Sequence, residues 1–177
     1  MESPTNKKNQ KLSIKQKAEK IKLLLTDNDG VLTDTGVYYS SEGEQLKRFS
    51  IRDGMGVERL NNIVSVKSGI ITGEFSGIVD RRAEKLKITE VHLGIKEKHL
   101  LFPEILKKNN LKAENVAFIG DDMNDYELMK LVGLTAAPSD AFPEIRDMVD
   151  YVCKNKGGNG AFREFAELII KYKLKVI

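Results

Sequence analysis

The sequence predicts an α/β fold built on a doubly wound parallel sheet, and three observations support this fold class. Short apolar runs of strand length alternate along the chain with longer segments whose apolar residues recur at helical spacing. This alternation is typical of parallel strands joined by right-handed helical crossovers. Two of the apolar runs end in acidic clusters beside a glycine, and open parallel sheets bind ligands at that end of their strands. The length of 177 residues suits one domain with a sizeable core.

The individual elements follow from the length and spacing of the apolar residues. Five runs predict buried strands: Ile21–Leu25, Gly69–Thr72, Val91–Leu93, Asn115–Ile119 and Leu134–Ala136. Helical spacing predicts helices at Met55–Asn62, Ser76–Leu86, Glu97–Lys108, Asn124–Leu131 and Ala161–Lys173. Pro103 lies inside the third of these segments, so that helix is expected either to kink or to begin late.

One segment departs from the alternation of strands and helices. Residues Val31–Phe49 are strand-like on both sides of a polar loop that contains Gly43, which predicts a β-hairpin with a longer loop. The hairpin directly follows the first acidic cluster. We therefore expect it to project over the same end of the sheet.

The composition limits the classes of function. The chain has 41% hydrophobic and 31% charged residues, as a soluble globular protein does, and its net charge of +3 is too small to indicate a nucleic acid partner. Lysines gather near the amino end, so residues 1–19 are predicted to form a flexible basic segment that leads into a short helix. Residues 20–177 are predicted to form a single domain. No apolar stretch is long enough to span a bilayer, and Cys153 is the only cysteine, which favours a cytoplasmic protein without a membrane partner.

The first acidic cluster consists of Asp27 and Asp29, which follow the apolar run Leu23–Leu25 and precede Gly30. Acidic residues often cap turns, so this pair alone is a weak signal. Two carboxylates so close together also repel each other, which suggests a bound cation or a shared proton. Together with a second acidic strand end, the pair predicts a magnesium-assisted centre for phosphoryl transfer.

The second acidic cluster is Gly120–Asp125, which opens a predicted helix. Asp121, Asp122 and Asp125 place three carboxylates there, more than the N-cap of a helix requires. Hard oxygen ligands of this kind suit Mg²⁺, and the cation would neutralise charge as a phosphoryl group is transferred.

Two further features could bind a phosphate. Thr72 and Gly73 end an apolar run, and they can offer a hydroxyl and backbone N–H groups to an anion, although an ordinary turn from strand to helix has the same residues. Phosphoryl transfer also needs a fixed cation, which Lys98 or Lys96 could supply. The residue types alone do not choose between these two lysines.

In combination, these features resemble the four motifs of the haloacid dehalogenase-like phosphatases. The matching residues, in the order and spacing of that superfamily, are Asp27–Asp34, Ile71–Gly73, Lys98 and Gly120–Asp125. Within the superfamily, the chain most resembles the 3-deoxy-D-manno-octulosonate 8-phosphate (KDO 8-phosphate) phosphatases, through Asp27–Asp34, Arg52–Gly56 and Gly157–Glu164. The resemblance implies the Rossmann-like fold of that superfamily and a Mg²⁺-dependent phosphatase for a 2-keto-3-deoxy sugar acid, with KDO 8-phosphate as the expected substrate.

The resemblance also implies roles for the acidic residues. Asp27 would be the nucleophile that forms an aspartyl-phosphate. Asp29 would protonate the leaving sugar oxygen and later deprotonate the attacking water. The Asp27 side chain, the Asp29 backbone carbonyl and the Asp121 side chain would hold Mg²⁺.

The other matched residues would surround these groups. Thr72, Gly73 and Lys98 would hold the phosphate, since the alignment of the motifs prefers Lys98 over its neighbouring lysine. Asp122 and Asp125 would orient the groups that contact the metal and the substrate.

Two positions depart from the family pattern. Asn28 stands between the two acids where a hydrophobic residue is common, and its side chain is expected to point away with little effect on the chemistry. Glu74 stands where many KDO 8-phosphate phosphatases have arginine, and an acid there would repel a substrate carboxylate unless a cation balanced it. Arg82 and Lys85 on the next helix are candidates for that role, or else ordinary surface charges. This Glu–Arg–Lys arrangement resembles a branch acting on 2-keto-3-deoxynononate 9-phosphate, so a nine-carbon or sialate-type 9-phosphate is the alternative substrate.

The segment lengths predict a site without a cap domain. Most of the superfamily covers the site with an inserted domain, but Gly30–Ile70 and Gly73–Gly120 are filled by predicted elements. Neither segment has the roughly 50 further residues that a separate domain needs. A neighbouring subunit can supply the missing walls, and the resemblance implies a homotetramer with the hairpin, residues 31–49, at the interface. A monomer with an open site is the alternative.

Two functions of another class compete with the phosphatase. A phosphoacceptor receiver also uses a magnesium-bound aspartate and a lysine, but it places the phosphorylated aspartate on the third strand, whereas Asp27 follows the first. A catalytically silent subunit would keep the fold for assembly alone. The presence of Asp27, Asp29, Lys98 and Asp121 argues against such decay.

Overall fold

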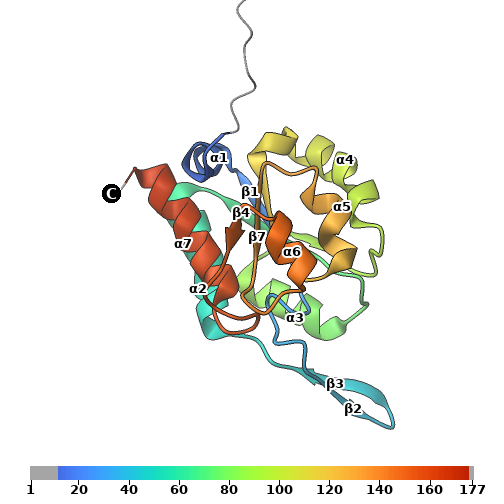
Figure 1. The fold of residues 1–177 in the computed structure, drawn as a ribbon. Coiled ribbons are helices and arrows are strands. Elements are labelled where there is room, and N and C mark those ends of the chain that lie inside the picture. The colour runs from blue at the N-terminus through green and yellow to red at the C-terminus, as the bar shows by residue number, and fades with distance from the viewer. Residues whose placement is uncertain (1–11, 176–177) are drawn as a thin grey trace, which may run out of the picture.

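The computed structural model describes residues 12–175 and has the predicted α/β fold (Figure 1). One sheet of parallel strands has the order β5-β4-β1-β6-β7-β8. The strands are β1 (Leu23–Thr26), β4 (Lys67–Ile71), β5 (Glu90–His92), β6 (Val116–Ile119), β7 (Leu134–Ala137) and β8 (Tyr151–Val152). The chain builds the sheet outward from β1 to β5, then returns to the other side of β1 with β6. This reversal opens a crevice at the carboxyl ends of β1 and β6, where doubly wound sheets bind ligands.

Helices cover both faces of the sheet (Figure 1). One face carries α1 (Ile14–Lys20), α2 (Ile51–Val64), α3 (Gly77–Leu86) and α7 (Ala161–Leu174). The other carries α4 (Lys98–Asn109), α5 (Tyr126–Met129) and α6 (Pro143–Met148), and 3₁₀ turns lie at Ala113–Asn115 and Met123–Asp125. The central strand shows why two layers form: Leu24 packs into the first core, whereas Leu23 and Leu25 pack into the second. Because both faces are covered, β1 is apolar at successive positions rather than alternating.

The structure confirms the predicted strands, each with ends shifted by at most two residues. The predicted helix Asn124–Leu131 is in fact a 3₁₀ turn followed by the short helix α5. Helix α4 begins at Lys98, one residue later than predicted, and continues through Pro103. Helix α6 and strand β8 were not predicted. Pro143 starts α6 and resembles a breaker, while β8 is too short for its alternation to be recognised.

Helices α2 and α7 interlock through two residues of α2. Asp53 is buried, and its carboxylate accepts hydrogen bonds from the backbone N–H groups of Gly160 (3.2 Å) and Arg163 (2.9 Å). An acid at this position binds free N–H donors at the start of α7, and its negative charge is stabilised by the positive end of the helix dipole. A Cβ on Gly56 would lie 3.1 Å from Cα of Arg163, so glycine allows the close approach. The family-like segments around Arg52–Gly56 and Gly157–Glu164 therefore fix one helix on the other.

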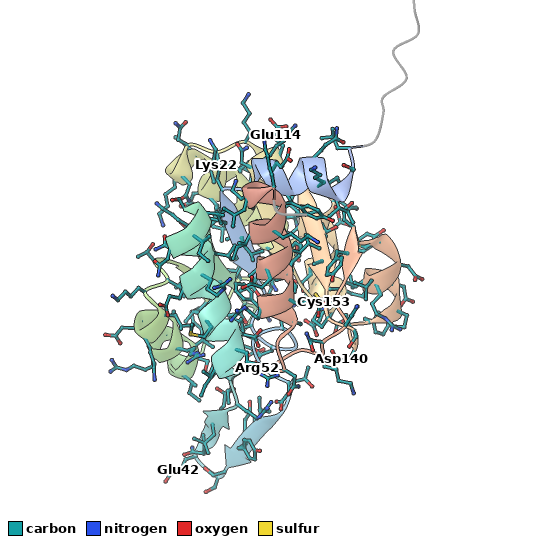
Figure 2. The ribbon with its side chains drawn as sticks, turned by 90° about the vertical axis from the view of Figure 1, so that its left-hand side faces the viewer. Lys22, Glu42, Arg52, Glu114, Asp140 and Cys153 are labelled. Carbon is teal, nitrogen blue, oxygen red and sulfur yellow. The ribbon has the colours of Figure 1, made fainter. Side chains whose placement is uncertain are left out.

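The predicted hairpin is present and projects from the end of the molecule (Figures 1 and 2). It consists of β2 (Val37–Ser40) and β3 (Gly43–Lys47), paired antiparallel with an irregular register between Tyr38 and Tyr39. Glu42 marks its tip in Figure 2, opposite the end that carries Lys22 and Glu114. Those two residues precede β1 and β6, so the hairpin extends from the carboxyl end of the sheet, as predicted.

The described part of the predicted basic segment contains α1. Its N-cap Ser13 and Gln16 form a capping box, and Ala18 packs into the core beside α7. The rest of that segment, residues 1–11, lies outside the described residues. Within residues 12–175, no helix is long and apolar enough to cross a membrane.

Candidate active site

The two acidic clusters and the Thr72–Gly73 loop meet at the carboxyl ends of β1, β4 and β6. They surround a pocket of about 370 Å³. The residues that line it are Asp27, Asp29, Thr35, Thr72, Gly73, Glu74, Asp121, Asp122 and Asn124. A larger groove of about 500 Å³ lies between α2 and α3, but its lining lacks the acidic cluster. The smaller pocket is therefore the candidate active site.

Asp27 is held at the first position after β1. Its backbone N–H continues the sheet by donating to the Ile119 carbonyl (3.0 Å), and the residue is only 4% exposed. Oδ1 of Asp27 accepts a hydrogen bond from the Asn28 backbone N–H (2.7 Å) and lies 2.9 Å from Nζ of Lys98. The strand and a buried cation thus fix one carboxylate oxygen at the floor of the pocket.

Lys98 links this carboxylate to the second acidic cluster. Its fully buried Nζ donates to Oδ1 of Asp125 (2.6 Å) and also faces Asp27. Burial by itself would lower the pKa of Lys98, but the carboxylates of Asp27 and Asp125 outweigh burial and raise that pKa. The side chain therefore stays a cation. Lys96 is exposed, so the structure assigns the fixed charge to Lys98.

Asp125 in turn orients Asp121. Oδ2 of Asp125 accepts a hydrogen bond from the Asp121 backbone N–H (3.0 Å), and its Oδ1 is held by Lys98. Asp122 lies at the surface, where its side chain accepts from the Met123 backbone N–H (2.6 Å). Asp125 therefore joins Lys98 to the Asp121 backbone, whereas Asp122 caps the turn that follows.

The buried acids carry more negative charge than Lys98 balances. One oxygen each of Asp27, Asp121 and Asp125 lie within 4.8 Å of one another. Burial, followed by the neighbouring carboxylates of Asp27, Asp125 and Asp122, raises the pKa of Asp121 to about 8. Burial and the charge of Asp125 likewise raise the pKa of Asp27. Such shifts show that the cluster favours a proton or a cation.

The arrangement of Asp121 fits a divalent cation. Its Oδ1 is buried and has no hydrogen-bond partner among residues 12–175. Gly30 has φ of +89°, and a Cβ there would lie 1.9 Å from Oδ2 of Asp121. Glycine is thus required for this carboxylate to lie against the Asp27–Asp29 turn. Closely spaced carboxylate oxygens without other partners are the ligands that Mg²⁺ prefers.

Asp29 lies at the side of the same pocket. Its Oδ1 accepts hydrogen bonds from Nδ2 of Asn28 (3.0 Å), Oγ1 of Thr33 (3.3 Å) and Nζ of Lys47 (2.6 Å). Its Oδ2 is buried and has no partner in the described part of the chain. The two oxygens of this carboxylate therefore have different surroundings.

The expectation that Asn28 points away from the chemistry is wrong. The side chain is fully buried and donates to Asp29. The expectation assumed that side chains still alternate as in a strand, but β1 ends at Thr26, and the backbone then turns through Asn28. Sequence reasoning also missed Lys47, because nothing local to β3 signals a contact with the loop after β1.

Thr72 and Gly73 line the same pocket from the loop after β4. Thr72 is 1% exposed, and its backbone N–H donates to the His92 carbonyl, which fixes the loop to β5. Oγ1 of Thr72 accepts from the Glu74 backbone N–H (3.4 Å), which leaves its own proton free to donate. A Cβ on Gly73 would meet nothing within 4 Å, so this backbone borders open space. The loop has room for an anion such as phosphate.

The structure does not bring Glu74, Arg82 and Lys85 together within one chain. Glu74 lines the pocket. The guanidinium of Arg82 instead donates to the Ser50 carbonyl (2.9 Å) and lies over the Phe49 ring. Lys85 lines the separate groove between α2 and α3. Within one chain, the three side chains therefore do not line one pocket.

The glycine-rich segment before α7 packs against the loop Asp27–Asp34, which we call the catalytic loop. A Cβ on Gly157 would lie 1.9 Å from the Gly30 carbonyl oxygen, and one on Gly158 would lie 2.5 Å from the Asp34 backbone nitrogen. The Gly158 backbone N–H donates to the Val31 carbonyl (2.9 Å). These glycines are therefore needed for two loops to pack backbone to backbone.

Comparison with known proteins agrees with this geometry. Residues 85–165 match the family model described as haloacid dehalogenase-like hydrolase. The chain is 41% identical over 154 residues to a 3-deoxy-D-manno-octulosonate 8-phosphate phosphatase of Escherichia coli K12, covering 87% of this chain and 81% of that protein. Its relative from Yersinia pestis is 40% identical over 156 residues, covering 88% and 82% of the two chains.

Solved structures give the same result. The phosphatase of this type from Moraxella catarrhalis, in complex with magnesium, phosphate and KDO, matches with a TM-score of 0.87 and 36% identity, over 92% of each chain. A cobalt-bound phosphatase from Haemophilus influenzae also has a TM-score of 0.87, with 37% identity over 90% of this chain and 93% of that one. The chain therefore belongs to the 3-deoxy-D-manno-octulosonate 8-phosphate phosphatase family of the haloacid dehalogenase-like hydrolases.

Proposed function

We propose that this chain is a magnesium-dependent phosphatase that hydrolyses KDO 8-phosphate to KDO and phosphate. The observation that carries the proposal is the position of Asp27. Its carboxylate is buried and held by Lys98, close to the carboxylate of Asp121, and it lines one pocket together with the open backbone of Gly73. This is the arrangement that an aspartate needs to attack phosphorus, and the relatives named above are phosphatases of this sugar acid.

The reaction takes two steps at the same carboxylate. In the first, an oxygen of Asp27 forms a bond to phosphorus while the bond from phosphorus to the sugar oxygen breaks, and Asp29 gives its proton to that oxygen. In the second, Asp29 takes a proton from water as the water oxygen bonds to phosphorus, and the bond from Asp27 to phosphorus breaks. Asp27 and Asp29 are then as they were before the reaction.

The remaining groups hold the reacting atoms in place. Lys98 fixes Asp27, and Thr72 with Gly73 faces the phosphate oxygens. Mg²⁺ supplies, when bound, positive charge that offsets the crowded carboxylates and the transferring phosphoryl group. Asp27, Asp121 and the Asp29 carbonyl would hold it, since Asp125 already directs both oxygens to Lys98 and to the Asp121 backbone.

The family assignment favours a hydrolase over the other two classes. A receiver would keep its phosphate, whereas Asp29 lies two residues from the nucleophile and has a free oxygen with which to activate water. A silent subunit would not need Lys98 buried between two acids. A cytoplasmic location remains a prediction from the sequence.

The substrate is tested by phosphate release with Mg²⁺ from KDO 8-phosphate, a nine-carbon 2-keto-3-deoxy 9-phosphate and non-acidic sugar phosphates. We expect the highest kcat/KM for KDO 8-phosphate. Glu74 lines the pocket, so Glu74→Arg should change the ratio of kcat/KM between the two acids by about tenfold, which corresponds to about 1.4 kcal/mol.

The matched control is Glu84→Arg, because Glu84 is exposed on α3 and pairs only with Arg81 among the described residues. It should leave the ratio unchanged. If the parent enzyme prefers the nine-carbon acid, the substrate assignment changes to that acid, whereas the proposed mechanism stands. A preference for small non-acidic phosphates would overturn the sugar-acid proposal.

We also propose that the chain assembles as a homotetramer through the hairpin. Val37, Tyr38, Tyr39 and Leu46 are 44%, 61%, 70% and 64% exposed there. Apolar side chains so exposed on a projecting hairpin favour association with another apolar surface. A second subunit over the pocket would also exclude water from the aspartyl-phosphate.

The assembly is tested with Tyr39→Asp, which places a charge on this surface. By sedimentation velocity, the parent should be a tetramer, and the variant should form smaller species with lower kcat/KM. Leu174→Asp is the matched control, since Leu174 is 49% exposed at the far end of α7. A monomeric parent, or an intact tetramer of Tyr39→Asp, would contradict the proposal.

A further inference from the structure

The hairpin reaches back into the active site through Lys47, the last residue of β3. Its Nζ lies 2.6 Å from Oδ1 of Asp29 and 3.3 Å from Oε2 of Glu44, and only 1% of its side chain is exposed. Lysine is seldom buried to this extent, because its ammonium group loses hydration unless it is paired. Two carboxylates provide that pairing here.

The contact fixes one oxygen of Asp29 and leaves the other free. Oδ1 accepts hydrogen bonds from Nζ of Lys47 (2.6 Å), Nδ2 of Asn28 (3.0 Å) and Oγ1 of Thr33 (3.3 Å). Oδ2 receives no donor from residues 12–175. Since all the donors converge on Oδ1, rotation of the carboxylate would break several hydrogen bonds at once. Oδ2 is thus the oxygen of Asp29 that has no hydrogen-bond donor within the described residues.

The same lysine connects the catalytic loop to α3. Oε1 of Glu44 accepts a hydrogen bond from Oγ of Ser76 (2.7 Å), the buried residue that precedes α3. Contacts therefore run from Asp29 through Lys47 and Glu44 to Ser76, at the end of the Thr72–Gly73 loop. The hairpin base joins the two sides of the pocket within one chain.

We propose that Lys47 is a positioning residue for the reaction, which holds Oδ1 of Asp29 so that Oδ2 faces the leaving oxygen and then the attacking water. The inference rests on the proposed role of Asp29 as acid and base. Lys47 touches no reacting atom and acts through Asp29. Asn28, at a position where the family commonly has a hydrophobic residue, adds a second donor to the same oxygen.

The experiment replaces the ammonium group by a neutral side chain of similar length, Lys47→Met. Two substrates are compared: the best sugar phosphate of the panel, whose leaving oxygen needs a proton, and p-nitrophenyl phosphate, whose leaving group does not. We expect kcat for the sugar phosphate to fall about 10- to 100-fold with little change in KM. The initial burst of p-nitrophenol should keep the parent rate, while the later turnover, which needs Asp29 to activate water, slows.

Three further variants and measurements separate positioning from folding. Lys47→Arg should restore part of the turnover, since a guanidinium can donate to the same oxygen. Arg48→Met is the matched control, because Arg48 follows Lys47 but pairs with Asp34 and the Gly158 carbonyl. It should leave the ratio of burst rate to turnover unchanged. A crystal structure of Lys47→Met should show the Asp29 carboxylate rotated.

Equal losses in burst rate and turnover would overturn the proposal, as would an Asp29 carboxylate in its parent orientation. Neither measurement requires the substrate to be a sugar acid. A wrong substrate assignment would change only the order of kcat/KM among the phosphate esters. A wrong role for Lys47 would instead appear in the ratio of burst rate to turnover and in the orientation of the Asp29 carboxylate.

Discussion

Asp27→Asn is expected to lower kcat for every phosphate ester by at least about a thousandfold, which corresponds to about 4 kcal/mol of transition-state stabilisation. The amide keeps the size and shape of the side chain, but it cannot donate an electron pair to phosphorus as a carboxylate does. Asp125, which also contacts Lys98, has its other oxygen bound to the Asp121 backbone N–H and so is not free to replace Asp27. The measurement is phosphate release under saturating substrate and Mg²⁺, together with the loss of acid-stable phosphate incorporation into the protein.

The matched control for this variant is Asp34→Asn in the same loop. Asp34 is exposed, and its carboxylate accepts from Arg48 and from the Gly36 backbone N–H rather than facing the pocket. It should keep kcat within a few-fold of the parent. Both variants should melt near the parent temperature, which separates lost chemistry from lost folding. A folded Asp27→Asn protein with parental turnover would remove the basis of the proposed mechanism.

Asp121→Asn is expected to stabilise the metal-free protein and to abolish its stabilisation by Mg²⁺. Burial and the neighbouring carboxylates raise the pKa of Asp121 to about 8, from 3.8. The folded state therefore holds this proton more tightly than the unfolded chain does. The resulting stability is complete below pH 3.8 and is lost as the pH rises to about 8. At pH 8 the asparagine removes the repulsion, which we expect to add roughly 1 to 3 kcal/mol and to raise the melting temperature by several degrees.

Mg²⁺ should raise the melting temperature of the parent but not that of Asp121→Asn. Because the cation displaces protons from the cluster, it should raise the melting temperature of the parent more at pH 8 than at pH 6, and about 2.7 kcal/mol is expected at a hundred times the dissociation constant. Thermal denaturation with EDTA or Mg²⁺ at both pH values measures this. Asp147→Asn, at an exposed position of α6, should behave as the parent does. A full Mg²⁺ response in Asp121→Asn would exclude this carboxylate as a ligand.

The sequence predicted those parts of the structure that depend on local pattern. Strand β1 is recognisable because a short apolar run ends abruptly in polar residues, and a parallel sheet then fixes which end carries them. The topology alone brings Asp27 close to Asp121, since both follow adjacent strands. The acidic cluster and the positions of the core strands along the chain thus follow from spacing and composition.

Contacts made across long sequence separations could not be predicted in this way. Lys47 reaches Asp29 only because the irregular hairpin folds back over the loop after β1. Asn28 points toward Asp29 because the backbone turns where the strand ends. Arg82 and Lys85 lie on the same helix. Arg82 nevertheless contacts the Ser50 carbonyl and the Phe49 ring instead of Glu74. In each case a tertiary contact, and not a local preference, sets the direction of the side chain.

The packing of Gly157 and Gly158 against the Asp27–Asp34 loop has a consequence for synthesis on the ribosome. The loop that holds the nucleophile is translated well before Gly157 and Gly158, whose backbone packs against it. A nascent polypeptide that stops before these glycines has the central strands without a finished catalytic loop. The packing of this loop can therefore be completed only after Gly157 and Gly158 have themselves been translated.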